Sequence, residues 1–96
     1  MADVSIRAND PTANVRDEID RGVPIPYWYQ LEGLFRQQIA LGHWKVGQRV
    51  PSEKQLCERY GVSRTTVRQA VGKLVESKLL FHVKGKGTFV GPLNGS

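Results

Sequence analysis

Two stretches of the chain repeat apolar residues with the spacing of an amphipathic helix. The first runs from Tyr27 to Leu41, after an extended lead-in that contains two prolines, and meets a natural stop at Gly42. The second begins after Ser63 and repeats apolar residues at intervals of three, four, seven and eight. This second stripe consists of Val67, Ala70, Val71, Leu74 and Val75. Both stretches are expected to be helices that face one core.

A shorter helix is predicted between them by its capping signals. In "PSEKQLCERYG", Ser52 is placed to cap the helix start, and Gln55 three residues later completes a capping box. Gly61 suits the left-handed residue that ends a helix, and Ser63 can cap the next helix at once. The three-residue turn predicts a helix-turn-helix, although any antiparallel helix pair shares part of this pattern.

After the third helix the pattern changes to short β-branched and aromatic runs. The stretch "LLFHVKGKGTFVG" predicts strands at Leu80 to Val83 and Thr88 to Val90, joined by a turn at Lys84 to Gly87. A short strand is also expected at Gln48 to Val50. The fold class is therefore α+β, with three helices followed by a two-stranded hairpin.

These patterns divide the chain into three segments. Residues 1 to 23 lack sustained periodicity and mix both charge signs, so we expect a flexible N-terminal arm. Residues 24 to 91 contain all the predicted helices and strands and should form one small domain. Residues 92 to 96, "PLNGS", are typical of a linker.

The positive charge is concentrated in the expected domain. Residues 1 to 23 hold three arginines against five carboxylates, whereas the remaining residues hold eleven basic side chains against four acidic ones. The net charge of +5 and a pI near 9.7 fit a polyanionic partner such as nucleic acid. Charge alone leaves open a basic surface that serves only solubility.

Composition argues against several other classes of function. The one cysteine, Cys57, cannot form an intramolecular disulfide, and with only His43 and His82 no metal or cofactor site is expected. No apolar run approaches the roughly 20 residues of a membrane span and no secretory signal begins the chain, so we expect a cytoplasmic protein without membrane contact. "GKGT" lacks the spacing of a phosphate loop, and no enzyme activity is expected.

The start of the third predicted helix is unusually basic. Arg64 and Arg68 lie near a helix N-terminus, which is already partly positive, so they call for an anionic partner. The helical repeat puts Thr65 and Gln69 opposite the apolar stripe. Arginine can read guanine O6 and N7 with two parallel hydrogen bonds, and glutamine can do the same for adenine. This face predicts a DNA major groove as partner, with a solvated polar face as the plain alternative.

The motifs together resemble a known family. "PSE", "VSRTTVRQA" and "GKGTFV", in this order and spacing, resemble the DNA-binding domain of the GntR family of bacterial transcription regulators, in its HutC-like branch. The match covers about Pro26 to Val90. The resemblance implies a winged helix-turn-helix that regulates transcription, often as a repressor, on a two-fold symmetric operator with GT and AC elements.

The resemblance and the helical geometry together imply the contacts with double-stranded DNA. A recognition helix at about residues 63 to 77 is expected in the major groove, with Arg64 the foremost base reader, and a wing at residues 84 to 87 in the adjacent minor groove. The expected DNA-binding residues are Arg49, Ser52, Lys54, Arg64, Thr65, Thr66, Arg68, Gln69, Lys84, Gly85, Lys86 and Gly87.

Three positions depart from the family pattern. Lys54 stands where many members have arginine, and a lysine cannot form two parallel hydrogen bonds, so we expect it to bind phosphate. Gly72 lies on the DNA-side face, where a longer side chain is usual. Lys78 replaces the glycine that commonly ends the third helix, so a left-handed residue there would cost about 1 kcal/mol.

The resemblance also implies features beyond these 96 residues. Family members carry a C-terminal domain that dimerises and binds a small effector, so we expect a homodimeric full-length protein with such a domain missing here. The main alternative function is a winged helix used for contact with protein or RNA. The basic residues of the expected groove-facing edge argue against protein contact, and the absence of free stacking aromatics argues against a sequence-specific RNA reader.

Overall fold

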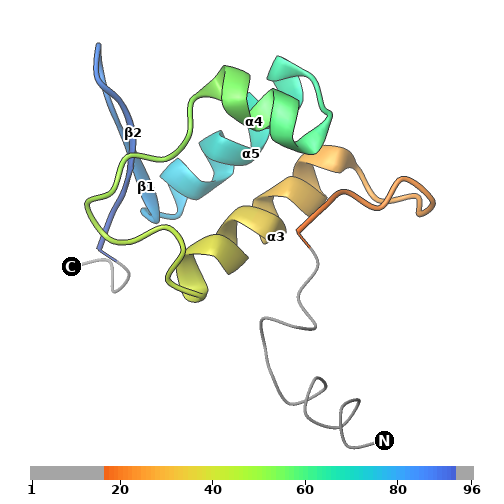
Figure 1. The fold of residues 1–96 in the computed structure, drawn as a ribbon, viewed down its shortest axis with the longest axis horizontal. Helices are drawn as coiled ribbons and strands as arrows, with labels where there is room; N and C mark the ends of the chain where they lie inside the picture. The colour runs from red at the N-terminus through yellow and green to blue at the C-terminus, as the bar shows by residue number, and fades with distance from the viewer. Residues whose placement is uncertain (1–16, 93–96) are drawn as a thin grey trace, which may run out of the picture.

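Within residues 17–92, three helices and one antiparallel hairpin make up the fold (Figure 1). The structure, a computed structural model, describes residues 17–92. The elements are α3 (Tyr27–Ala40), α4 (Glu53–Tyr60), α5 (Arg64–Glu76), β1 (Leu80–Val83) and β2 (Gly87–Val90). This order confirms the predicted fold class, with element ends within one residue of those expected. Within residues 17–92, no helix has the length and apolar character needed to cross a bilayer.

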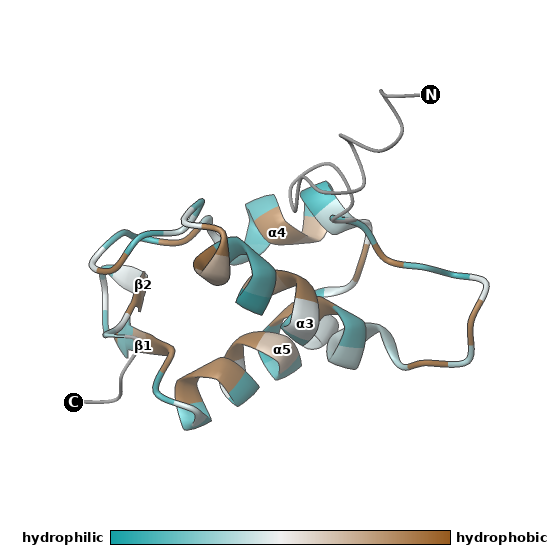
Figure 2. Cartoon of the chain, turned by 90° about the horizontal axis from the view of Figure 1, so that it is seen from below, coloured by the Kyte–Doolittle hydropathy of each residue, from teal (hydrophilic) through white to brown (hydrophobic). Residues whose placement is uncertain are grey.

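The core forms where α3 packs on α5. Leu31 and Phe35 of α3 and Ala70 and Leu74 of α5 have no exposed surface, and Figure 2 shows the hydrophobic side of α5 turned toward α3. The ring of Phe35 lies 5.2 Å from that of Trp44 and 5.7 Å from that of Tyr60. The apolar stripes predicted from helical spacing therefore meet in one core, which the hairpin closes from one side.

The helix-turn-helix follows its predicted capping signals. The Ser52 hydroxyl accepts from the Gln55 backbone N–H at 3.1 Å, and the Gln55 side chain accepts from the Ser52 backbone N–H at 2.8 Å, which completes the capping box. Gly61 ends α4 with φ 67°, a conformation that costs glycine little. Ser63 then caps α5 through the backbone N–H of Thr66. Local sequence therefore fixes both ends of the turn.

The hairpin is tied to the segment that precedes α4. Leu80 pairs with Val90 and Val83 with Gly87, so the second strand starts one residue earlier than predicted. The strand expected at residues 48–50 appears as a single bridge between Arg49 and Phe89. Backbone hydrogen bonds on either side of this bridge, from Val90 to Gln48 and from Val50 to Thr88, hold the hairpin to the helices.

Residues 17–22 differ from the flexible arm expected for residues 1 to 23. Ile19 is buried in the core, and the side-chain amide of Gln30 both donates to and accepts from the backbone of Asp20, at 3.0 and 2.8 Å. Arg21 donates to the carbonyl oxygens of Tyr60 and Gly61 at the end of α4. Helical periodicity gives no sign of these contacts because they join positions 10 to 40 residues apart. The rest of the expected arm, residues 1–16, lies outside the described residues.

Asp17 fastens this segment to α4. Its carboxylate accepts a 2.6 Å hydrogen bond from the Tyr60 hydroxyl and a 2.8 Å bond from Arg59, with which it forms an ion pair. Burial raises the pKa of the Tyr60 phenol, and the hydrogen bond and charge of Asp17 raise this pKa further. The Tyr60 hydroxyl therefore remains a donor to Asp17 throughout the neutral range.

Replacing Asp17 with Ala should lower the free energy of unfolding by about 1 to 2 kcal/mol, because the hydroxyl of the buried Tyr60 loses its charged acceptor. Urea denaturation measures the change. Glu18→Ala, which removes a neighbouring exposed carboxylate, serves as the matched control and should change stability by less than about 0.5 kcal/mol. Equal stability of the two variants would contradict a structural role for Asp17.

Lys78 adopts the left-handed backbone conformation, with φ 69°, that was predicted to destabilise the fold at this position. Between residues 17 and 92 it is the one residue other than glycine with a positive φ. Lys78→Gly should raise the free energy of unfolding by about 0.5 to 1 kcal/mol, since glycine adopts this conformation without a Cβ clash. Thermal and urea unfolding measure the gain. Lys78→Ala removes the same amine but keeps the clash, so a gain of equal size in the alanine variant would sink this explanation.

Candidate nucleic-acid interface

The start of α5 exposes the side chains expected to read bases. Arg64, Thr65, Arg68 and Gln69 are all exposed along the outer side of the helix, opposite the buried Val67. Thr66 is half-buried, and its hydroxyl lies 3.0 Å from that of Ser63 in the helix cap. The predicted base-reading residues therefore share one face, while Thr66 belongs to the edge of that face and to the cap.

Glu53, the first residue of α4, lies between the two arginines of this face. Its carboxylate accepts from Arg68 Nε at 2.6 Å and from Arg68 Nη2 at 3.0 Å, whereas Arg64 Nη1 is 3.9 Å away. The hydrogen bonds from Arg68 hold the pKa of the Glu53 carboxyl below its ordinary value, with smaller effects from the Arg68 and Arg64 charges. The same bonds raise the pKa of Arg68. Arg68 is thus engaged with Glu53, and Arg64 is the less constrained cation.

Sequence reasoning assigned no role to Glu53 and assigned Arg68 to DNA alone. The carboxylate suits the N-terminal turn of α4 because it complements the positive end of that helix. Its contact with Arg68 spans 15 residues and depends on the angle between the two helices. The available sequence signal was the placement of an acidic residue directly after the cap of one helix and a basic residue in the second turn of the next.

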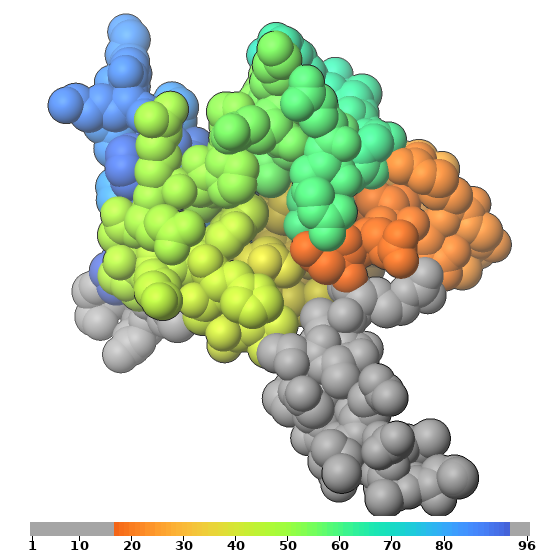
Figure 3. Space-filling model, in the orientation of Figure 1, coloured from red at the N-terminus to blue at the C-terminus, as the bar shows by residue number. Residues whose placement is uncertain are grey.

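The wing and the start of α4 project on the same side of the molecule as two lobes separated by a hollow (Figure 3). Lys54 is exposed beside the α4 cap, and Lys84, Gly85 and Lys86 form the exposed turn of the hairpin. Gly85 has φ 78° within that turn. The start of α4, which carries Lys54, and the wing turn, both expected to contact DNA, therefore project on one side of the molecule.

Arg49 lies against the base of the wing. A Cβ at Gly87 would lie 2.9 Å from Arg49 Nε, and Gly87 has φ 126°, which other residues rarely adopt. Glycine at position 87 therefore gives the Arg49 side chain its room beside the hairpin. The bridge between Arg49 and Phe89 fixes the backbone of this pair.

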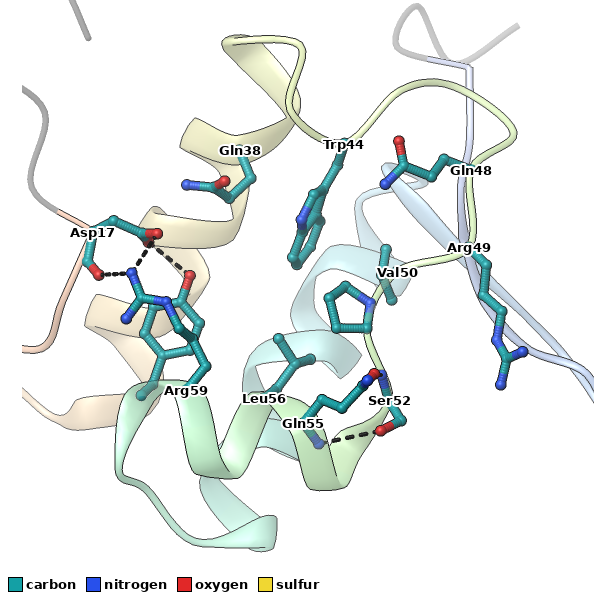
Figure 4. A pocket seen from close by; sticks show the side chains of 12 residues that line it. Asp17, Gln38, Trp44, Gln48, Arg49, Val50, Ser52, Gln55, Leu56 and Arg59 are labelled. Carbon is teal, nitrogen blue, oxygen red and sulfur yellow. Dashed lines mark hydrogen bonds and ion pairs between the residues drawn. The ribbon is translucent and has the colours of Figure 1, made fainter.

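A second hollow lies on the other side of α4, between α3 and the segment from Trp44 to Ser52 (Figure 4). Trp44 and Leu56 line its middle, Arg49 and Ser52 lie at one end, and the contact between Asp17 and Arg59 closes the other. Within residues 17–92 no group of three or more His, Cys, Asp or Glu side chains is arranged to hold a metal ion.

Known proteins are similar to this chain in sequence and in fold. A family model described as "Bacterial regulatory proteins, gntR family" matches residues 29–90. The HTH-type transcriptional repressor NagR of Bacillus subtilis (strain 168) is 43% identical over 72 residues, which cover 75% of this chain and 30% of that protein. The Histidine utilization repressor of Klebsiella aerogenes is 33% identical over 75 residues, which cover 78% of this chain and 31% of that protein. The matched segment therefore spans less than a third of these curated relatives.

Solved structures of DNA-binding domains in complex with operators are similar to this chain. The crystal structure of AraR(DBD) in complex with operator ORX1 has a TM-score of 0.72 and 35% identity to this chain, with 77% of this chain and 94% of that chain covered. The agreement extends over nearly the whole of that domain.

The carboxyl of Glu53 should titrate below its ordinary value of 4.5, and Arg68→Ala should return the midpoint toward that value because it removes both hydrogen bonds. Carbon-detected NMR of the glutamate side chains measures both midpoints. Arg64→Ala removes an equal charge without a hydrogen bond and should move the midpoint less. A larger change in the Arg64 variant than in the Arg68 variant would contradict the geometry.

Proposed function

The chain belongs to the GntR family of bacterial regulatory proteins, in its HutC-like branch, and we propose that it is the sequence-specific DNA-binding domain of a transcription regulator. The observation that carries this proposal is the exposed first turn of α5, with Arg64 and Thr65 facing outward at a helix N-terminus. The operator complex of the similar AraR domain supports double-stranded DNA as the partner.

In the proposed complex α5 enters the major groove with its N-terminal turn first. Arg64 donates two parallel hydrogen bonds to guanine O6 and N7, and Thr65 contacts the neighbouring base or backbone. Gln69, one turn further along, reaches an adenine. Arg68 keeps its ion pair with Glu53 or exchanges it for a DNA acceptor, so its contribution to affinity is smaller than that of Arg64.

The remaining contacts hold the domain on the sugar-phosphate backbone. Arg49 and Lys54 neutralise phosphates, and the hydroxyls of Ser52 and Thr66 lie beside helix-start amides that bind phosphate. The wing turn enters the adjacent minor groove. The proposed wing residues are Lys84, Gly85, Lys86 and Gly87.

The proposed operator is two-fold symmetric, because two copies about 34 Å apart read the same face of the duplex. Its GT and AC elements are those that the family resemblance implies. The full-length protein is proposed to be a cytoplasmic homodimer, associated with the nucleoid, whose further domain binds a small effector. The repressor names of the curated relatives support repression as its effect on transcription. Neither an enzymatic activity nor a cofactor is part of the proposal.

Binding to a duplex with paired GT and AC half-sites should exceed binding to a scrambled duplex, and Arg64→Ala should remove about 1–3 kcal/mol of this discrimination. Fluorescence anisotropy over a range of salt concentrations measures both. Non-specific affinity should persist in the variant, with log affinity falling against log salt at a slope near −4.5 if about five phosphates are neutralised.

Arg36→Ala is the matched control for this experiment. Arg36 is an arginine of α3 that pairs with Glu32 and donates to Ser77 at the end of α5, and its loss changes the net charge equally without removing a contact at the start of α5. Equal affinity of the wild type for both duplexes, unchanged by Arg64→Ala, would leave only a basic surface. In that case the winged helix would serve contact with protein or RNA.

A further inference from the structure

The inner face of the hairpin carries two polar side chains that the proposed contacts leave unused. Alternation along the strands places His82 on the same face as the buried Leu80, and Thr88 on the same face as the buried Val90. His82 and Thr88 are paired across the hairpin, and the His82 Nδ1 and Thr88 Oγ1 atoms are 3.2 Å apart. His82 is exposed and Thr88 is half-buried. On the core-facing side of the hairpin, the buried Leu80 and Val90 are therefore followed toward the turn by the polar pair His82 and Thr88.

This pair lines a cleft between the hairpin and the recognition helix. Apolar side chains of Val67 and Val71 lie on the α5 side of the cleft, and the charged Glu53 and Arg68 also line it. Gly72 also lines it, and a Cβ at this position would meet no atom within 4 Å. The missing side chain at Gly72, which sets this chain apart from the family pattern, thus leaves the cleft open.

If the proposed function is correct, the path of the bound DNA indicates which ligand occupies this cleft. If α5 occupies the major groove and the wing turn the neighbouring minor groove, the sugar-phosphate strand that separates the two grooves has to cross between α5 and the wing. The cleft lies between these two elements. We propose that His82 and Thr88 bind a phosphate of this strand and that protonation of His82 strengthens DNA binding.

The charges around His82 determine the sign of the effect. Glu53 at the start of α4 favours a cation in the cleft, whereas Arg68 on α5 and Lys78 after α5 disfavour one. Because Glu53 and Arg68 form an ion pair with each other, their opposite effects on His82 largely cancel. A phosphate adds negative charge directly at the histidine and can accept from its ring N–H and from the Thr88 hydroxyl. Histidine gains its proton between pH 8 and 5, so binding should tighten as the pH falls.

The affinity of the chain for the paired GT and AC duplex, measured by anisotropy between pH 7.5 and 5.5 at constant ionic strength, tests the proposal. The wild type should bind about five- to tenfold more tightly at pH 5.5 than at pH 7.5, as expected for one charge-assisted contact. His82→Gln should lose most of this dependence. His43→Gln removes the one other histidine, which contacts Gln38 at the far end of α3, and should retain the dependence.

Salt dependence separates a phosphate contact from a structural role of His82. At pH 5.5 the slope of log affinity against log salt should be about 0.9 steeper for the wild type than for His82→Gln, since one more phosphate is neutralised. His82→Lys should bind tightly at both pH values, and Thr88→Val should weaken binding of the protonated wild type.

Three results would overturn the proposal: a wild-type affinity that does not change with pH, a pH dependence that survives in His82→Gln, or equal salt slopes for these two proteins. All three presuppose measurable binding to the duplex. If no variant binds any duplex at either pH, the proposed function itself fails, which is a distinct outcome.

Discussion

The tight turn between α4 and α5 is the constraint on which the rest of the structure depends. Gly61 turns the chain with a left-handed residue, and Ser63 starts the next helix two residues later. This turn fixes the angle between the helices, so the buried side chains of Tyr60 and Val67 join one core. It also brings Glu53 within hydrogen-bonding distance of Arg68, 15 residues further along. Arg21 donates to the carbonyl oxygen of Gly61 and so braces the turn from outside.

The cationic side chains on the surface next to this turn differ in how firmly other residues hold them. Arg68 donates two hydrogen bonds to the carboxylate of Glu53. Arg64 lies 3.9 Å from the same carboxylate and is freer to bind an external acceptor. Arg49 is held in place by the bridge to Phe89 and by the space beside Gly87. A carboxylate among these cations weakens indiscriminate attraction to polyanions, since any ligand of Arg68 must compete with Glu53. The arrangement suits a surface that discriminates between ligands more than it maximises charge.

Sequence patterns predicted the features that local chemistry determines. The caps at Ser52 and Ser63 and the hairpin follow from residue types a few positions apart, and the left-handed Lys78 follows from its position at a helix end. The contacts of Asp17 with Tyr60 and of Glu53 with Arg68 were not predictable, because they join polar side chains across 43 and 15 positions and depend on the tertiary fold. The individual DNA-binding residues stay predictions until a complex is studied.

The most direct test of the account is a map of backbone amide chemical shifts while the ¹⁵N-labelled chain is titrated with a duplex carrying GT and AC half-sites. The account predicts that the changes centre on the first two turns of α5, the start of α4 and the wing turn. The exposed side of α3, around Tyr29 and Arg36, should change little. Changes centred on Ile25, Tyr27 and Tyr29, with the start of α5 unaffected, would contradict it.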